Sequence, residues 1–155
     1  MTTFVIPCVA AFAASAGFSI LYEIRGKKII IASLCGFLAW AAYLLTFYIC
    51  KMEILSYFVA GAVVALYSEM AACIFKNPVT LFLTPGIIPT VPGLTIYHTM
   101  QACLYGDTAN FLEYGIKTLK IGGAIVLGLI LVSSLWRMAR AIINRISRKP
   151  DIVEE

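Results

Sequence analysis

Four stretches of the chain are long, apolar and almost free of charge, and short polar segments separate them. They cover about 2–22, 29–50, 54–75 and 114–136. About 20 apolar residues suffice for a helix to cross the hydrocarbon core of a bilayer. Each stretch therefore predicts a transmembrane helix. In the last one, the long side chains of Lys117 and Lys120 are expected to place their ammonium groups at the interface.

The first of these stretches also predicts a packing surface. Its small residues recur at the four-residue spacing that lets two helix backbones approach closely. These residues are Ala10, Ala13, Ala14 and Gly17. We expect them to form a row against another helix.

A fifth stretch, 79–105, is equally long but is predicted to be broken. Its centre reads Thr84-Pro85-Gly86-Ile87-Ile88-Pro89-Thr90-Val91-Pro92-Gly93. Each internal proline removes a backbone hydrogen bond and clashes with the carbonyl one turn back, at a cost of ~3 kcal/mol or more. Lipid offers no replacement partners, so such backbone must lie against protein or a wet cavity. The predicted fold class is an all-α integral membrane protein with about five transmembrane helices, the fourth broken by this Pro/Gly motif.

The composition supports a membrane protein and excludes several other classes. Of 155 residues, 61% are hydrophobic and 13% are charged, whereas a soluble domain has about 25% charged residues. The five cysteines are scattered without a CxxC pair, so we expect neither a disulfide framework nor a metal site. We find no catalytic motif and expect no enzyme activity and no cofactor. The first stretch lacks a basic leader, and we expect a retained helix rather than a signal peptide.

The lysines and arginines predict the orientation. If 79–105 crosses the membrane, Lys51, Lys117 and Lys120 lie on one side, and the other nine of the 12 basic residues lie on the opposite side. Those nine are Arg25, Lys27, Lys28, Lys76, Arg137, Arg140, Arg145, Arg148 and Lys149. The positive-inside rule then predicts that the N-terminus lies outside and the C-terminus lies in the cytoplasm. A re-entrant stretch would leave four basic residues inside and eight outside, so the rule favours a full crossing.

The expected partners follow from this topology. We expect membrane domain 1–136 to contact lipid, and segment 137–155 to continue the last helix as a basic tail at the anionic cytoplasmic surface rather than to bind nucleic acid. An odd number of crossings places a duplicated unit upside down in the membrane, as in transporters built from inverted repeats. Five short helices enclose too little for an alternating-access path, so we expect a second copy or a related subunit.

The broken stretch is the candidate substrate site. Glycines permit positive φ and close approach of a ligand, and the amides of a restarting half-helix suit a carboxylate. The candidate substrate-binding residues are Thr84, Pro85, Gly86, Pro89, Thr90, Pro92, Gly93 and Tyr97. The alternative is a proline-kinked helix without a ligand.

Two titratable residues are candidates for coupling. Glu69 is the acidic residue well inside a predicted span, where a charge usually faces a cavity or a partner. It is expected either to couple protons or bind a substrate ammonium, or to pair structurally with Lys76 or Arg25. His98, the sole histidine, can titrate near neutral pH or serve as a structural hydrogen bonder.

The run from Phe82 to Tyr97 resembles the threonine/serine exporter family, in which a similar motif reads close to PGIIPxVPGxxxY. Gly106-Asp107 and the preceding helix with Glu69 and Lys76 fit the same pattern. The chain is most similar to the short C-terminal unit of that family, the YjjB-like small subunit. The resemblance implies a subunit of a secondary exporter of small hydrophilic metabolites, threonine/serine-type amino acids first and dicarboxylates such as succinate as the alternative. It also implies a larger five-span partner subunit, with a homo-oligomer as the alternative. The competing functional class is a non-transporting scaffold or channel-like subunit.

Overall fold

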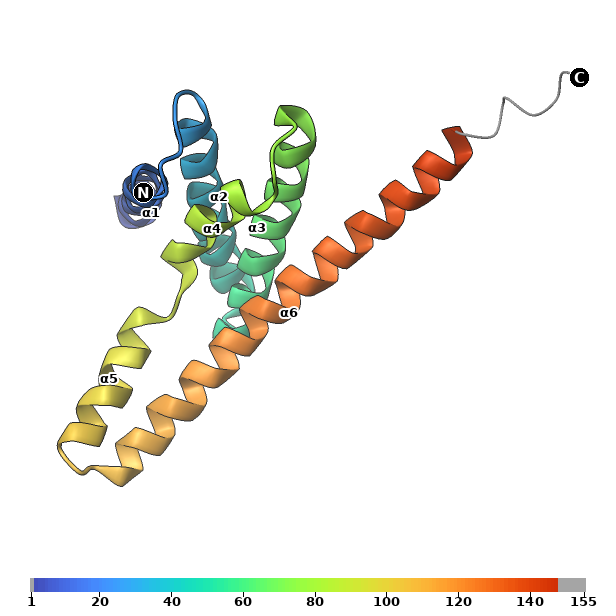
Figure 1. Cartoon of the computed structure of the whole chain (residues 1–155). Coiled ribbons are helices and arrows are strands. Elements are labelled where there is room, and N and C mark those ends of the chain that lie inside the picture. The colour runs from blue at the N-terminus through green and yellow to red at the C-terminus, as the bar shows by residue number, and fades with distance from the viewer. Residues whose placement is uncertain (1, 148–155) are drawn as a thin grey trace, which may run out of the picture.

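The computed structural model describes residues 2–147, and within them it contains helices and connecting turns only (Figure 1). The elements are α1 (Thr2–Leu21), α2 (Lys28–Cys50), α3 (Glu53–Phe75), α4 (Thr80–Ile87), the 3-10 turn η1 (Ile88–Thr90), α5 (Gly93–Leu104) and α6 (Thr108–Ser147). Four helices, α1, α2, α3 and α6, are long and apolar enough to cross a membrane, and the α4–η1 segment forms a pair with α5 that is bent by 57°. The predicted all-α membrane class is confirmed, with four to five candidate spans and a fourth apolar segment that is broken.

The first helix packs along the second, but not through the predicted row. The aromatic rings of Phe4 and Tyr48 lie 6.1 Å apart, and Ser15 contacts Gly36, so α1 and α2 run antiparallel. The buried row of α1 consists of Cys8, Ala11, Ser15 and Ser19. Ala10, Ala13, Ala14 and Gly17 are exposed. The predicted row was wrong because α1 is apolar on all sides, so its pattern does not show which small residues face protein.

The centre of the bundle lies between α2, α3 and α4. Cys35 and Ala39 of α2 pack against Val64 of α3, and Phe82 of α4 is fully buried in an adjoining cluster. The Tyr67 hydroxyl donates to the Ile31 carbonyl at 3.0 Å and ties α3 to α2. Small residues at most of these positions let the helix backbones approach, which is the main source of packing energy between helices in lipid.

Helix α6 lies beside α3 and runs in the same direction. Lys117 pairs with Glu53 at the beginning of α3, at 2.9 Å, and the Arg140 guanidinium donates to the Cys73 sulfur near its end. Between these contacts two glycines set the crossing. A Cβ on Gly61 would lie 2.6 Å from the Ile125 carbonyl oxygen, and one on Gly128 would lie 3.0 Å from the Ala62 nitrogen.

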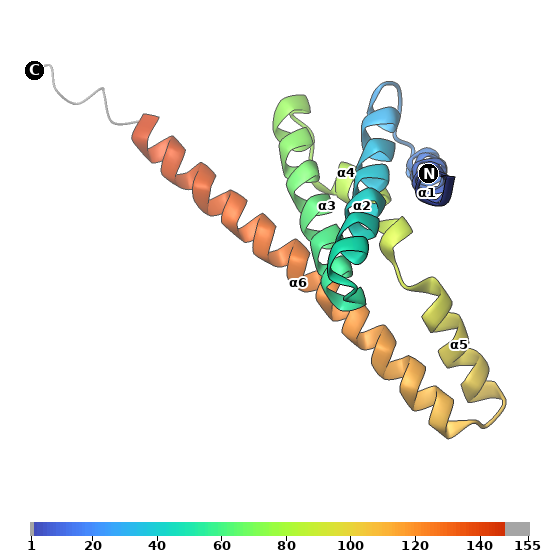
Figure 2. The same cartoon turned by 180° about the vertical axis from the view of Figure 1, so that it is seen from behind.

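Helices α5 and α6 form a hairpin that extends away from α1–α4 in both views (Figures 1 and 2). Gly106 makes the turn with φ +71°, and Asp107 caps α6 by accepting from the Asn110 amide at 3.2 Å. This hydrogen bond holds the pKa of Asp107 below its usual value. Among the described helices, α5 packs against α6 alone.

The broken pair takes the chain from one end of the bundle to the other. It starts after Lys76, at the end of α3, and leads to α6, which passes Glu53 at Lys117 and later passes Cys73 at Arg140. A re-entrant loop would instead start α6 at the Lys76 end. The direction of α6 therefore agrees with the full crossing that the basic residues predict.

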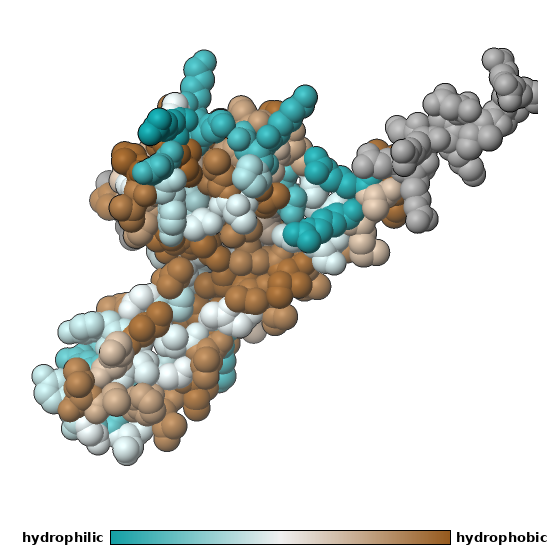
Figure 3. Space-filling view, in the orientation of Figure 1, coloured by the Kyte–Doolittle hydropathy of each residue, from teal (hydrophilic) through white to brown (hydrophobic). Residues whose placement is uncertain are grey.

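The basic residues gather at the end of the bundle that carries the α1–α2 and α3–α4 turns. Lys28 donates to the Asn77 side-chain oxygen at 2.9 Å across these turns. In Figure 3 hydrophilic side chains gather there and along the C-terminal part of α6, while apolar surface covers the middle. Helix α6 continues unbroken to Ser147 over 40 residues, or about 60 Å at 1.5 Å per residue. Arg148 and Lys149 of the predicted tail lie outside the described residues.

We expect the α3–α6 crossing to depend on Gly61 and Gly128. Gly61→Ala and Gly128→Ala place a methyl group against backbone of the facing helix, and overpacking of this kind costs about 1–3 kcal/mol. Thermal unfolding of the purified protein in detergent should show a lower midpoint for each variant. Gly122→Ala and Gly123→Ala are matched controls, because a Cβ at either position meets no atom within 4 Å. Equal midpoints for all four variants would contradict this assignment.

Candidate functional site

The helix break lies between Ile88 and Gly93, and the prolines explain it. Val91 is extended with ψ 133°, as expected before proline, where the ring of the next residue disfavours the helical conformation. Pro92 has ψ 59°, and α5 begins at Gly93. The Thr90 hydroxyl donates to the Ile87 carbonyl at 2.6 Å and so satisfies one of the backbone acceptors that the break exposes.

Only the first half of the predicted site is sheltered by this chain. Pro85, Gly86 and Thr90 are buried, and Thr84 and Pro89 are half-buried. On the other side of the break, Val91 and Gly93 are exposed, and the side chain of Tyr97 is 61% exposed. The predicted shelter from protein is therefore present for α4 and η1 but not for the start of α5.

Gly86 is the point at which α4 packs against α2. A Cβ on Gly86 would lie 2.9 Å from the Cβ of Cys35 and still closer to its sulfur, so the missing side chain lets α4 touch α2. The positive-φ glycines of the described chain are Gly26 and Gly106. The positive φ that Gly86 and Gly93 permit is not adopted at either residue, and the helix is broken at the prolines without it.

A pocket of about 300 Å³ lies beside the break, between α1, α2 and η1. It is lined by Pro7, Ala10, Ala11 and Ala14 of α1, by Trp40 of α2 and by Pro89. This volume is at the lower end of the range for small-molecule sites. Two of the exposed small residues of α1, Ala10 and Ala14, therefore form part of the pocket wall.

Two polar groups next to this pocket have no hydrogen-bond partner. They are the Nε1–H of Trp40, which lines the pocket, and the hydroxyl of Ser15, and both atoms are buried. Ser15 and Pro89 both approach Gly36, where a Cβ would be 3.0 Å from the Ser15 Cβ and 3.3 Å from the Pro89 Cγ. A buried unpaired donor is costly, so these two groups are candidate hydrogen-bond donors to a solute at the break.

These three residues of α1 and α2 are the part of the site that sequence reasoning missed. Trp40 and Ser15 are polar donors inside the apolar spans of α2 and α1, and Gly36 lies one turn before Trp40 on α2. A polar donor in the middle of a transmembrane span is a signal that could have found them. Their proximity to Pro89 depends on tertiary packing.

The N-terminus of α5 has the predicted free amides. No side chain caps it, and the first helical bond runs from the Ile96 amide to the Pro92 carbonyl at 3.1 Å. The amides of Leu94 and Thr95 therefore remain available at the positive end of the helix.

His98 points away from the break. Its ring lies 5.3 Å from that of Tyr114 on α6 and 5.5 Å from that of Tyr97. It lines a separate pocket of about 210 Å³ at the tip of the α5–α6 hairpin, together with Asp107 and Asn110. The structure does not bring His98 and Tyr97 to the pocket at Pro89.

Glu69 is buried in α3, with 4% of its surface exposed. It falls on the row of α3 that faces α6, because Ala62 and Cys73 of the same row contact α6 and residues four apart share a helix face. It does not line the pocket at Pro89. Within residues 2–147 it forms no ion pair with Lys76 or Arg25, so the structural pairing considered for it is not formed.

We expect Gly86→Ala to destabilise the protein by about 1–3 kcal/mol, since it forces α4 away from Cys35. Thermal unfolding in detergent should show a lower midpoint, and Cys35→Ala in the same chain should restore part of it by removing the sulfur. Gly93→Ala is the control, because a Cβ there meets no atom within 4 Å. Additive effects of Gly86→Ala and Cys35→Ala would contradict direct contact.

The fold and the site define a helical membrane protein with a small pocket at a broken transmembrane crossing. A sequence profile of the family described as "Threonine/Serine exporter, ThrE" matches residues 7–135. This chain belongs to the threonine/serine exporter family, and it is a transporter-type protein as that family's name implies. No curated protein and no solved structure gives a significant match.

Proposed function

We propose that this chain is one half of a secondary exporter of small hydrophilic metabolites, with threonine/serine-type amino acids as substrates. The observation that supports this most is the pocket beside Pro89, whose wall includes Trp40, a residue with a buried Nε1–H that has no hydrogen-bond partner. A donor without a partner next to a pocket at broken backbone suits a polar solute. The free amides of Leu94 and Thr95, on the other side of the helix break, suit a carboxylate.

The exposed half of the break supports the proposal of a partner. Val91, Gly93 and Leu94 are exposed although they adjoin irregular backbone, which lipid does not tolerate. Helix α5 also packs against α6 alone among the described helices. A second, inverted unit would cover both surfaces, supplied by a larger subunit of the same family or by another copy. We further propose a bacterial inner membrane, with the N-terminus outside and the basic end in the cytoplasm.

Efflux measurements test the transport function and its substrate. Cells that express the chain, with and without a co-encoded larger partner, are loaded with radiolabelled threonine or succinate. We expect faster threonine efflux when both are present. Faster succinate efflux alone would assign the chain to dicarboxylates, and no change for either solute would favour a non-transporting scaffold.

Trp40→Phe tests the pocket, because it keeps a large aromatic ring and removes only the N–H. A hydrogen bond to a charged group contributes about 1.5–3 kcal/mol, and 1.4 kcal/mol is a factor of ten. We therefore expect threonine efflux at low internal concentration to fall about tenfold or more. Trp136→Phe is the matched control, since its Nε1–H is also buried and unpaired but Trp136 does not line this pocket. Equal effects of the two variants would contradict the assignment.

We propose Glu69 as the coupling carboxylate, supported by its burial without an ion pair to Lys76 or Arg25. Glu69→Gln keeps the shape of the side chain but cannot bind or release a proton. Efflux of this variant should no longer respond to an imposed pH gradient. Glu23→Gln, in an exposed turn, should respond like the wild type. A full response of Glu69→Gln would remove Glu69 from the mechanism.

A further inference from the structure

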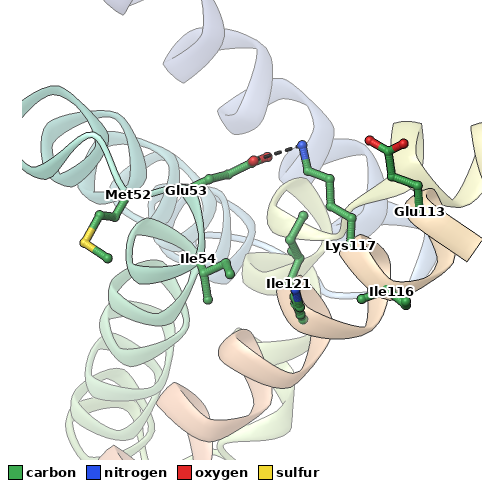
Figure 4. A pocket seen from close by; sticks show the side chains of 8 residues that line it. Met52, Glu53, Ile54, Glu113, Ile116, Lys117 and Ile121 are labelled. Carbon is green, nitrogen blue, oxygen red and sulfur yellow. Dashed lines mark ion pairs between the residues drawn. The ribbon is translucent and has the colours of Figure 1, made fainter.

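A second pocket, of about 530 Å³, lies at the end of the bundle opposite the basic turns (Figure 4). It is formed by the beginning of α3 and the first part of α6. Its lining residues are Met52, Glu53, Ile54, Glu113, Ile116, Lys117, Lys120 and Ile121. Figure 4 shows Glu53 and Lys117 reaching toward each other from the two helices, with Glu113 on the same helix as Lys117.

The pocket is lined by two acidic and two basic side chains, and only one of each forms an ion pair. Glu53 and Lys117 form the ion pair at 2.9 Å, with 38% and 46% of their side chains exposed. Glu113 and Lys120 form no ion pair within residues 2–147. Two carboxylates and two ammonium groups therefore share one cavity, and one of each sign is free.

The spacing on α6 presents opposite charges one turn apart. Glu113 and Lys117 are separated by four residues and Lys120 follows three later, so all three lie on one side of the helix. The ammonium and carboxylate of an α-amino acid are held close together on one carbon. Such a molecule can place its ammonium at Glu113 and its carboxylate between Lys117 and Lys120. The isoleucines Ile54, Ile116 and Ile121 provide apolar surface for its side chain.

We propose that this pocket is a second substrate site, which binds zwitterionic amino acids and disfavours dicarboxylates. A zwitterion leaves the pocket neutral, whereas a dianion meets two carboxylates and lacks a group for either of them. Ion pairs that remain exposed to water are weak, so the site holds its ligand loosely, as suits release. The role as a release site rests on the proposed export function and its orientation, whereas binding itself does not.

The test measures binding without transport. Saturation-transfer NMR is recorded on the purified full chain in phosphatidylglycerol nanodiscs, with L-threonine as the probe. Trp40→Phe serves as the background so that the pocket at Pro89 contributes little. We expect saturable threonine binding that Glu113→Gln and Lys120→Gln each weaken at least fivefold, while Lys120→Arg retains it. Glu23→Gln and Lys27→Gln, in the exposed turn at the other end, are the matched controls.

Ligand analogues and lipid separate the possible outcomes. N-acetylthreonine, which lacks the ammonium, and succinate should bind at least fivefold more weakly than threonine. The proposal is overturned if the wild-type pocket binds no threonine, if succinate binds equally well, or if Glu113→Gln and Lys120→Gln bind like the controls. Loss of threonine binding when phosphatidylethanolamine is added would assign the pocket to a zwitterionic lipid headgroup and also overturn it. If cells export threonine but Glu113→Gln and Lys120→Gln bind threonine as the wild type does, only this second site is refuted. If threonine binding is as expected but cells show no threonine efflux, only the export function is refuted.

Discussion

The constraint on which the structure depends is that lipid satisfies no backbone hydrogen bond. The four long helices satisfy this constraint, because their backbone hydrogen bonds are made within each helix. The break at Ile88–Pro92 does not, and the bundle responds to it in two ways. The Thr90 hydroxyl bonds to the Ile87 carbonyl, and α1 and α2 cover Pro89. The exposed start of α5 is the part of the break that this chain leaves uncovered, and it is the observation behind the proposal of a second unit.

Close backbone contacts at glycines, more than the burial of large side chains, hold the helices together. Without a hydrophobic effect between helices in lipid, close backbone approach supplies much of the packing energy. Gly86 admits Cys35, Gly36 admits Ser15, and Gly61 and Gly128 set the crossing of α3 and α6. These contacts bring Trp40 and Pro89 to one pocket. The same requirement for close packing therefore builds both the bundle and the site at the break.

The charged groups are arranged along the length of the bundle. Basic residues lie at the end with the α1–α2 and α3–α4 turns, Glu69 is buried between α3 and α6, and carboxylates and ammonium groups share the pocket at the opposite end. The pocket at Pro89 is uncharged and lies between these ends. Such an order fits a solute that is held by hydrogen bonds inside the membrane and by charge at its surface, as proposed for this member of the threonine/serine exporter family.

The sequence by itself determined the membrane class, the boundaries of the first three helices to within a residue, the break at the prolines and the family resemblance, because hydrophobic length and proline chemistry are local properties. It predicted the last helix too short, at 114–136 instead of Thr108–Ser147. It also identified Pro89 and Thr90 as parts of an interrupted helix. Only the tertiary structure decided which small residues of α1 face α2 and that Gly86 packs against Cys35. It also decided that His98 faces Tyr114 and that Glu69 lies on the side of α3 that faces α6. A helix that is apolar on all sides has no periodicity to mark its buried face, so only the packing of neighbours selects it.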